Sequence, residues 1–251
     1  MPETFKINVI FHNYLVPECY ETLSGEDIEQ HVRFVGVNAK LPKSVPPELA
    51  PYVIEERELR WYNPFLQHNR FCESSVFFHA WKNPSIFLQD TYIGFIHYDM
   101  LLKKEALACI RAELATATAP VLFTQATLVA RPHLDQVFKL TQWDKLVQLY
   151  NIIFKKSHTI HTIIDKEIPL YHSFVMHRDT FHRMMVFAEA AIPYMFEMLN
   201  YDTRHLPYQI ERLHGIFLAL QKEDGNPARW IPLPGVIHQD RLKDNWQTPA
   251  L

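Results

Sequence analysis

The chain has 251 residues, of which 48% are hydrophobic and 13% aromatic, so it carries enough apolar side chains to bury a core. A formal net charge of −3, without any long block of like charges, gives no field that would attract a nucleic acid, and we expect no nucleic-acid partner. The three cysteines, Cys19, Cys72 and Cys109, form no CxxC pair, which argues against a zinc ribbon or a disulfide framework. Because neither a signal-peptide core nor an apolar run of about 18 residues occurs, we expect a cytoplasmic protein with no integral membrane segment.

Strands and helices are predicted to alternate along the chain. Residues 5–12 and 32–38 have the β-branched and aromatic residues of buried strands, and residues 24–31 between them have the acids of a helix start. Residues 41–59 and 226–251 are rich in proline and have no clear period. The alternation predicts one α/β domain with a mostly parallel central sheet flanked by helices. Further strands are expected at 92–97, 119–129 and 170–179, and further helices at 69–83, 102–117, 140–156, 179–199 and 208–222.

Three of the predicted strands end in polar clusters. These clusters are residues 12–13 (His-Asn), 97–99 (His-Tyr-Asp) and 177–179 (His-Arg-Asp). In open α/β sheets, ligands bind beyond the carboxyl ends of the strands. We therefore expect the three clusters to meet at one site.

The cluster that ends with Asp99 has the residue types of a metal site. Residues two apart in a strand project to the same side, which would place the His97 ring beside the Asp99 carboxylate. An imidazole nitrogen and a carboxylate oxygen can share a divalent cation such as Mn²⁺. The pair would equally serve as a cap or a hydrogen-bonded pair at the strand end, and both interpretations stay open at this point.

The 14 histidines allow a different kind of site. His158 and His161 lie three residues apart and, with His172, His177 and His182, would form the cluster of a zinc-dependent hydrolase. No HExxH motif accompanies them, and solvated or buried histidines are the alternative interpretation.

Several segments carry a family resemblance. The segment NRFCESSVFFHAWKN (69–83), followed by YIGFIHYDM (92–100), resembles the pattern Y-C-E-L-T-x-x-Y-W-x-W-K-N and then G-x-x-H-Y-R-R of a family of bacterial glycosyltransferases of capsule and exopolysaccharide synthesis. Later segments are similar to the family's F-V-M-x-x-x-x-F and E-R-L-x-x-x-x-L patterns. Related domains glycosylate the capsids of large algal viruses, for which the location would be the host cytoplasm. The best-matched residues are Cys72, Glu73, Trp81, Lys82, Asn83, Gly94, His97, Tyr98, Glu211, Arg212 and Leu213.

The resemblance implies a GT-A fold, which is a Rossmann-like domain that binds a nucleotide sugar. Residues 1–251 would form a single glycosyltransferase domain, with the nucleotide-sugar-binding half in 1–100 and the acceptor side and tail in 101–251. The implied partners are a UDP- or GDP-sugar donor and a saccharide or glycan acceptor, and the implied cofactor is Mn²⁺ or Mg²⁺. Where the family has two arginines after His-Tyr, this chain has Asp99 and Met100, which brings it closer to the Asp-x-Asp metal motif of GT-A enzymes. Metal binding by His97 and Asp99 is therefore expected.

Donor-binding residues follow from the same resemblance. GT-A enzymes hold the base and ribose beyond the first strands, and ordinary loop polarity is the alternative explanation for the polar residues found there. An arginine at a helix start, Arg70, would face the diphosphate, whereas Glu73 is also explained as a helix first-turn acid. The residues to which the resemblance gives donor contacts are His12, Asn13, Tyr14, Asn38, Asn69, Arg70, Glu73, Lys82 and Tyr98.

Inverting transfer needs a carboxylate that takes the proton of the acceptor hydroxyl. The resemblance favours Glu211 for this role, with Asp179 as the competing candidate, and both are also explained as capping or ion-paired acids. The tail segment VIHQDRLKDNW is similar to a late element of some retaining GT-A enzymes whose histidine binds the metal. His238 would take that role, although the glycine and proline of the element are missing.

These observations predict a metal-dependent glycosyltransferase that moves a hexosyl or deoxyhexosyl group from a nucleoside-diphosphate sugar, with inversion, in polysaccharide or glycoprotein glycan biosynthesis. One alternative is a nucleotide-sugar-binding or glycan-binding module without catalysis, because the arginines of the family motif are absent. The other is the His-rich metallohydrolase.

Overall fold

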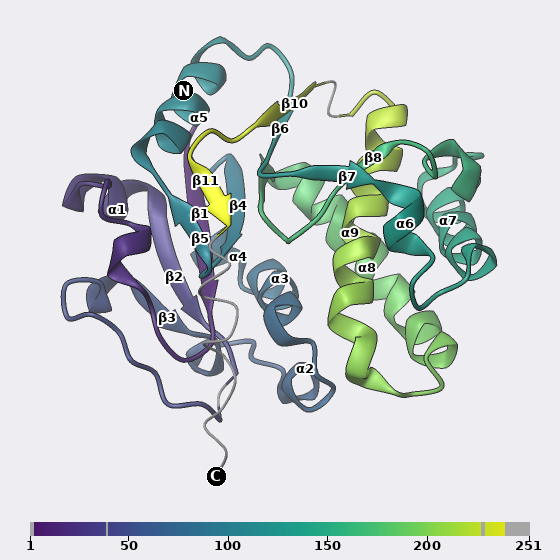
Figure 1. The fold of residues 1–251 in the computed structure, drawn as a ribbon, viewed down its shortest axis with the longest axis horizontal. Helices are drawn as coiled ribbons and strands as arrows, with labels where there is room; N and C mark the ends of the chain where they lie inside the picture. Colours follow the sequence, from purple (N-terminus) through teal and green to yellow (C-terminus); the bar gives the residue numbers. More distant parts are fainter. Residues whose placement is uncertain (1–2, 39, 227–228, 239–251) are drawn as a thin grey trace.

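The central sheet of the protein has seven strands with helices on both faces (Figure 1). The structure is a computed structural model, and it describes residues 3–38, 40–226 and 229–238. The predicted fold class, an α/β domain with a mostly parallel central sheet, is confirmed. In sheet order the strands are β10 (Arg229–Pro232), β6 (Val121–Thr124), β9 (Phe174–His177), β4 (Tyr92–His97), β1 (Phe5–Phe11), β2 (Val32–Gly36) and β3 (Val53–Glu55).

Strand β9 is the exception to the parallel arrangement. It pairs antiparallel with β4 on one side and with β6 on the other, whereas β1, β2, β3 and β4 are mutually parallel and β10 is parallel to β6. In this register His177 lies opposite Tyr92, at the start of β4, and Phe174 lies opposite Phe95. The expectation that all three polar clusters meet at one edge is therefore wrong for residues 177–179, which lie at the opposite edge of the sheet.

Two hydrophobic cores cover the two faces of the sheet. Alternate side chains of β1 divide between them, with Ile7 and Val9 in the core under one pair of helices and Ile10 in the core on the other face. The first face is covered by α1 (Gly25–His31) and α5 (Lys104–Thr116). The second is covered by α3 (Ser75–Lys82), α7 (Leu140–Phe154), α8 (Arg178–Met198) and α9 (Leu206–Glu223).

Two short ladders lie outside the main sheet. Strand β11 (Val236–His238) pairs antiparallel with β5 (Met100–Leu102), and β7 (Thr127–Val129) pairs with β8 (Glu167–Pro169). No helix in the described ranges combines the length and apolar character needed to cross a bilayer. The remaining elements are α2 (Pro64–His68), α4 (Pro84–Phe87), α6 (Ala130–Leu134) and the 3-10 turns Pro17–Cys19, Ala50–Tyr52, Glu56–Glu58, Cys72–Ser74, Ile160–Thr162 and Thr203–His205.

Gly94 lies in the centre of the sheet, where no side chain fits. A Cβ atom at this position would come within 2.8 Å of Val175 Cγ2 in β9 and 3.1 Å of Ile7 Cγ1 in β1. The Asn8 amide donates to the Gly94 carbonyl oxygen at 2.9 Å and is itself fully buried. The close approach of β1, β4 and β9 thus depends on a glycine.

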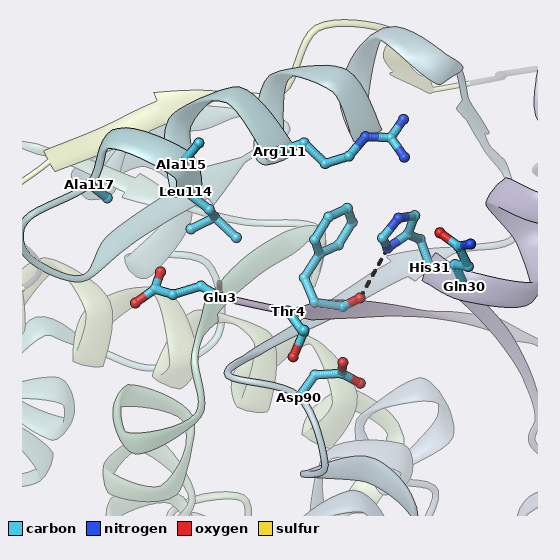
Figure 2. Close-up of a pocket in the computed structure, with 10 residues that line it drawn as sticks. Glu3, Thr4, Gln30, His31, Asp90, Arg111, Leu114, Ala115 and Ala117 are labelled. Atoms are coloured by element: carbon cyan, nitrogen blue, oxygen red, sulfur yellow. Dashed lines mark hydrogen bonds between the residues drawn. The ribbon is translucent and has the colours of Figure 1, made fainter. Parts of the chain in front are cut away.

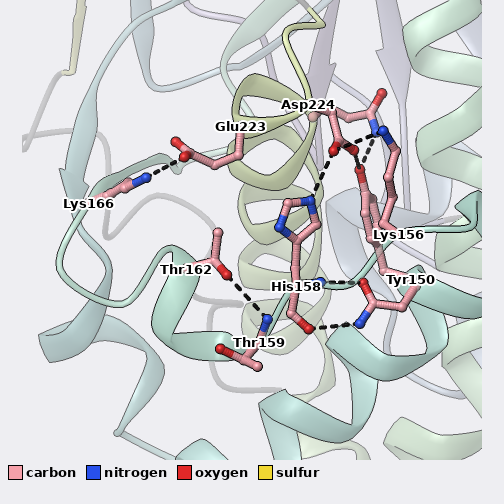
Figure 3. Close-up of polar contacts among 10 residues, drawn as sticks. Tyr150, Lys156, His158, Thr159, Thr162, Lys166, Glu223 and Asp224 are labelled. Atoms are coloured by element: carbon pink, nitrogen blue, oxygen red, sulfur yellow. Dashed lines mark hydrogen bonds and ion pairs between the residues drawn. The ribbon is translucent and has the colours of Figure 1, made fainter.

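A polar network joins α7, the following loop and the end of α9 (Figure 3). The Asp224 carboxylate accepts hydrogen bonds from the Tyr150 hydroxyl (2.6 Å) and the His158 Nε2 (2.9 Å), and it pairs with Lys156 Nζ (3.1 Å). Burial acts to raise the pKa of Asp224, but these three donors outweigh it and lower that pKa. The network therefore stabilises the folded state above the pKa of the unfolded carboxyl group, and this stabilisation is lost as the pH falls.

Replacing the Asp224 carboxylate should destabilise the protein. We expect Asp224→Ala to lower the free energy of unfolding at pH 7 by roughly 1–3 kcal/mol, because the Tyr150 hydroxyl and the His158 ring lose their acceptor. Urea unfolding at pH 7 and at pH 4 measures the effect, and the difference from the wild type should narrow at the lower pH. The control is Asp135→Ala, which removes an exposed carboxylate at the end of α6 and should leave the midpoint unchanged. Equal midpoints for wild type and Asp224→Ala would contradict the stabilising role.

Candidate active site

The carboxyl ends of β1 and β4 form the point where the strand order of the sheet reverses. From β1 the chain adds β2 and then β3 on one side, and it then crosses to the other side of β1 to add β4. In open α/β sheets this position is a crevice in which ligands bind. His12 follows β1 directly, and His97 is the last residue of β4.

An ion pair between His12 and Glu73 spans this position. The His12 Nε2 lies 2.5 Å from Glu73 Oε1, and the His12 ring meets the buried Tyr98 ring edge-on, with centroids 5.9 Å apart. Burial acts to raise the pKa of Glu73, but the charge and hydrogen bond of His12, together with the charge of His97, hold that pKa at about 2. Glu73 is therefore an anion at neutral pH. It belongs to a 3-10 turn that packs against α9.

His97 has a nitrogen directed at neither solvent nor a protein acceptor. Its Nε2 is buried and has no hydrogen-bond partner among the described residues. The ring contacts His172 edge-on at 5.9 Å, and its charge lowers the pKa values of both Glu73 and Glu211. His97 therefore lies within electrostatic range of two carboxylates, and its Nε2 has no partner in the part of the chain that the structure describes.

Other buried polar atoms near this point also lack hydrogen-bond partners within the described ranges. They include Tyr14 Oη in the turn after β1, Ser74 Oγ beside Glu73, and His214 Nε2 on α9. Buried polar groups in proteins are nearly always paired with protein atoms or ordered water. These atoms lie on the segments that carry His12, Glu73 and Glu211, where water or a polar ligand would complete their hydrogen bonding.

A short strained segment, Tyr171 and His172, contacts α9 just before β9 begins. Both residues have left-handed backbones, with φ of 64° and 46°. The Tyr171 N–H donates to Glu211 Oε1 at 2.7 Å, and His172 Nε2 lies 3.1 Å from His214 Nδ1. One residue further on, Gly215 allows β8 to approach, because a Cβ there would come 2.5 Å from the Pro169 carbonyl oxygen. Backbone strain of this kind is concentrated at functional sites.

Burial and the contact with Tyr171 both affect the pKa of Glu211. Burial raises the pKa of Glu211 and outweighs the hydrogen bond from the Tyr171 N–H and the nearby charges of His97 and Arg212, which lower it. Burial also lowers the pKa values of His172 and His214, the latter to about 3, so both imidazoles are neutral at pH 7. A carboxylate with a raised pKa, one helical turn from a neutral histidine pair, is suited to accept a proton.

The three residues expected to bind a metal lie on neighbouring segments. Strand β4 ends at His97, so Tyr98 and Asp99 occupy a turn and the two-residue alternation of a strand does not apply to Asp99. Asp99 lies close enough to Tyr20 and Tyr98 for its charge to raise the pKa values of both phenols, after the larger effect of burial. The backbone of His238 pairs with Met100 in the β11–β5 ladder, next to Asp99.

The turn after β2 is closed by a lysine that the sequence did not single out. The Lys43 ammonium group donates to the carbonyl oxygens of Val37, Asn38 and Leu41, at 2.5, 2.9 and 3.3 Å. Burial lowers the pKa of Lys43 to about 8. Asn38 has a left-handed backbone with φ of 60°, and it lies at the same edge of the sheet as His12.

Four other residues predicted to contact the donor are exposed or interact with other parts of the protein. Arg70 is exposed with φ of 58°, and the Asn69 amide bonds to the Phe65 carbonyl oxygen at 2.9 Å. The Asn13 carbonyl oxygen accepts from the Ser44 N–H at 2.6 Å. Lys82 lies at the far end of α3, where it pairs with Glu189 of α8 at 2.8 Å.

Asp179 and the candidate site lie at opposite ends of the strands. It is an exposed residue in the first turn of α8, where its N–H donates to His177 Nδ1 at 3.2 Å. Since β9 runs antiparallel to β4, this turn lies beside the amino end of β4. The placement corrects the prediction that Asp179 competes with Glu211 as base.

The histidines of the zinc-hydrolase alternative are also separated. His158 binds Asp224, His177 bonds to the N–H of Asp179, and His182 accepts from the Trp81 indole at 2.9 Å. Of these histidines, His172 is the one whose ring contacts His97 at the carboxyl edge of the described sheet. Across the described residues, no group of three or more histidine, cysteine, aspartate or glutamate side chains is arranged to hold a metal ion.

A large pocket lies at the opposite edge of the sheet, between α1 and α5 (Figure 2). Its volume is about 930 Å³, and His31, Arg111 and Asp90 are among the residues that line it. Two of its polar side chains are already engaged, since the His31 ring stacks on Phe5 at 4.2 Å and Arg111 pairs with Asp27 at 3.3 Å. None of its lining residues carries one of the unpaired buried atoms found in the described structure. We therefore place the candidate site at the carboxyl edge.

Sequence reasoning missed Tyr171, His214 and Lys43 as parts of the site. Glu211 and His214 are three apart on one helix, which places both on the same face and was the available signal. Tyr171 could not be found in this way, because only the antiparallel direction of β9 brings it to the carboxyl edge.

An open, mostly parallel sheet with polar groups at its carboxyl edge defines the class of fold. No protein-family model and no curated protein sequence matches the chain significantly. Among solved structures, the chain is similar to the bifunctional glycosyltransferase WbbM in its apo form, with a TM-score of 0.59 and 13% identity over 93% of this chain and 44% of WbbM. Mouse xyloside xylosyltransferase 1 aligns over 92% of this chain and 85% of its own, but its TM-score of 0.38, at 10% identity, is too low to carry an argument. The chain thus spans less than half of WbbM and shares the fold of the part of WbbM that it matches.

The Glu73 carboxylate should make stability depend on pH. Because the pKa of Glu73 is held at about 2, below its ordinary value of 4.5, its pairing stabilises the fold above pH 4.5 and is lost as the pH falls toward 2. We expect Glu73→Gln to cost roughly 1–3 kcal/mol of unfolding free energy at pH 6.5 and much less near pH 3. Urea titrations at a series of pH values measure the difference. Glu105→Gln, which changes an exposed acid of α5, is the control. A pH-independent difference for Glu73→Gln would contradict the assigned ionisation.

Proposed function

We propose that the protein is a glycosyltransferase that moves a sugar from a nucleoside-diphosphate sugar to a saccharide acceptor. The observation that carries the proposal is the gathering of His12, Glu73, His97 and Glu211, with several unpaired buried polar atoms, at the strand-order reversal of the sheet. The fold shared with WbbM supports it. Glycosyl transfer needs a bound nucleotide, a stabilised leaving group and a base, and residues suited to each lie at this edge.

Donor binding would use the turns after β1 and β2. Asn38 is held in a left-handed backbone by the Lys43 ammonium group, which fixes the turn beyond β2. Tyr14 offers a buried hydroxyl with no hydrogen-bond partner within the described ranges. We assign the base and ribose of the donor to these turns, as in the sequence prediction.

A divalent cation, Mn²⁺ or Mg²⁺, would be held by His97 and Asp99, with His238 as a further ligand. The unpaired His97 Nε2 and the backbone pairing of His238 with Met100 fit this assignment. When bound, such a cation stabilises the negative charge that develops on the leaving diphosphate. The Glu73 anion pairs with His12 and would keep that imidazole oriented, and it lies within electrostatic range of His97.

Glu211 is the assigned base. Its buried carboxylate has a raised pKa, and the Tyr171 N–H fixes one of its oxygens, which leaves the other to accept the proton of the acceptor hydroxyl. Direct attack by that hydroxyl on the anomeric carbon would invert the configuration. NMR of the product linkage, compared with the anomer of the donor, tests the stereochemistry.

Thermal shift with nucleotide sugars tests donor and metal together. We expect one of the UDP-, GDP-, dTDP- or ADP-sugars to stabilise the protein only with Mn²⁺ present, since ligand at one hundred times its Kd adds roughly 2.7 kcal/mol. Asp99→Asn should abolish the metal-dependent part, whereas the control Asp179→Asn, at the opposite edge, should retain it. The absence of a shift with every nucleotide would overturn the proposal. Donor binding without transfer to any acceptor would instead indicate a binding module.

Removing the base should slow transfer without weakening donor binding. We expect Glu211→Gln to lower kcat by about 10²-fold or more, because a glutamine cannot accept the proton, while the KM for the donor stays within about twofold. Initial-rate kinetics of nucleotide release with a saccharide acceptor measures both constants. The control is Glu223→Gln in the same helix, whose carboxylate pairs with Lys166. Unchanged kcat in Glu211→Gln would remove the residue from the mechanism.

A further inference from the structure

A groove lies between α2, the segment that follows it, and the C-terminal half of α8. Its volume is about 510 Å³, which is within the range of small-molecule sites. The walls are mostly apolar and include the rings of Phe65, Phe71 and Phe196. The groove is separate from the cluster around His97, and no role in donor binding or proton transfer accounts for it.

Exposed aromatic rings form one side of the groove. Phe65 is 51% exposed and Tyr201 is 71% exposed, although both belong to a chain of ring contacts. Phe65 packs against Phe196 with centroids 6.0 Å apart, and Phe196 stacks on Tyr201 at 6.2 Å. Exposed aromatic rings arranged in this way offer flat faces on which the apolar face of a ligand can pack.

The side-chain amides of two asparagines border these rings. The Asn63 side-chain oxygen Oδ1 accepts from the Phe65 N–H at 3.0 Å, and the Asn69 side-chain nitrogen Nδ2 donates to the Phe65 backbone carbonyl oxygen at 2.9 Å. Each asparagine therefore keeps its other amide atom available for a ligand. The charged residues in the lining, Glu189 and Glu197, are both acidic. Donors and acceptors with negative charge nearby suit a neutral polyhydroxyl compound and disfavour an anion.

The groove opens at the same edge of the sheet as the candidate active site. Helix α8 begins beside the amino end of β4, and its 21 residues extend for about 30 Å, so its last turns pass the carboxyl edge. On the other wall, Asn69 and Phe71 belong to the short segment that leads directly to Glu73. One wall of the groove is thus two residues along the chain from Glu73 of the candidate active site.

We propose that this groove binds sugar units of an uncharged oligosaccharide acceptor, beyond the unit that receives the transferred sugar. The C–H bonds of a pyranose face carry partial positive charge and pack on the electron-rich faces of Phe65 and Tyr201, while the asparagine amides bind hydroxyl groups. The carboxylate of Glu197 disfavours uronic acids and phosphorylated glycans, whereas the charge of Glu189 is compensated by Lys82 at 2.8 Å. The inference rests on the proposed transferase function and names the class of its acceptor.

Saturation-transfer NMR with short oligosaccharides tests the groove. The probes are maltotriose, cellotriose, xylotriose and chitotriose as neutral compounds, and trigalacturonate as the anionic one. We expect at least one neutral trisaccharide to bind, with Kd raised at least tenfold in Phe65→Ala and in Tyr201→Ala. The control Tyr208→Ala removes a ring that is 55% exposed on α9 outside the groove lining, and it should leave Kd unchanged. Circular dichroism checks that each variant is folded.

The outcomes separate this inference from the proposed function. Binding of none of the neutral probes, equal binding by wild type and both groove variants, or preferential binding of trigalacturonate would each overturn the groove assignment. Phe65→Ala and Tyr201→Ala should keep the metal-dependent shift given by the nucleotide sugar, because neither ring lies in the donor site. Oligosaccharide binding in the groove, in a protein that no nucleotide sugar stabilises, would support the groove while overturning the transferase.

Discussion

The packing of β4 between β1 and β9 is the constraint on which this structure depends. At Gly94 the three strands come so close that even a methyl group would collide with Val175 and Ile7. This contact fixes the register of β4 against β1. Strand β4 therefore ends three residues later, with His97 next to the turn that carries His12. The relative position of the two histidines is thus determined inside the core, where little adjustment is possible.

The direction of β9 distributes polar residues between the two edges of the sheet. Its entry, at Tyr171 and His172, lies at the carboxyl edge and contacts α9, whereas its exit, at His177, lies at the other edge. An extra antiparallel strand therefore supplies the site with a backbone N–H and an imidazole that a purely parallel sheet could not place there. The left-handed backbone of both residues is maintained by their bonds to Glu211 and His214.

Long, periodic elements could be predicted from the sequence, and so could much of the site. Strands β1 and β4 and helices α7 and α9 lie close to their predicted positions, because their apolar residues recur at the strand or helix period. Strands β10 and β11 have three or four residues each, too few for a period, so the segment from 226 onward was expected to be irregular. The direction of β9 has no local signature, which is why the position of Asp179 was predicted wrongly.

The residues that carried the family resemblance divide into scaffold and site. Asn83 accepts from the Trp61 N–H at 3.1 Å and fixes the loop before α2, while Trp81 bonds to His182. These side chains hold α3 in place and lie at its C-terminal end, away from the carboxyl ends of β1 and β4. Glu73, His97 and Glu211 are matched residues that face the site. A motif of this kind therefore records packing as well as chemistry, and only the structure separates the two.

The contacts that build the site join segments that are distant along the chain. His12 and Glu73 are 61 residues apart, His172 and His214 are 42 apart, and Tyr171 and Glu211 are 40 apart. Closing such long loops costs entropy before the contacts form, so the site is expected to be among the last features to assemble during folding, after the local turns of α7, α8 and α9. A partly folded chain would contain these helices and still lack the site, and any ligand that binds there would report complete folding of the molecule.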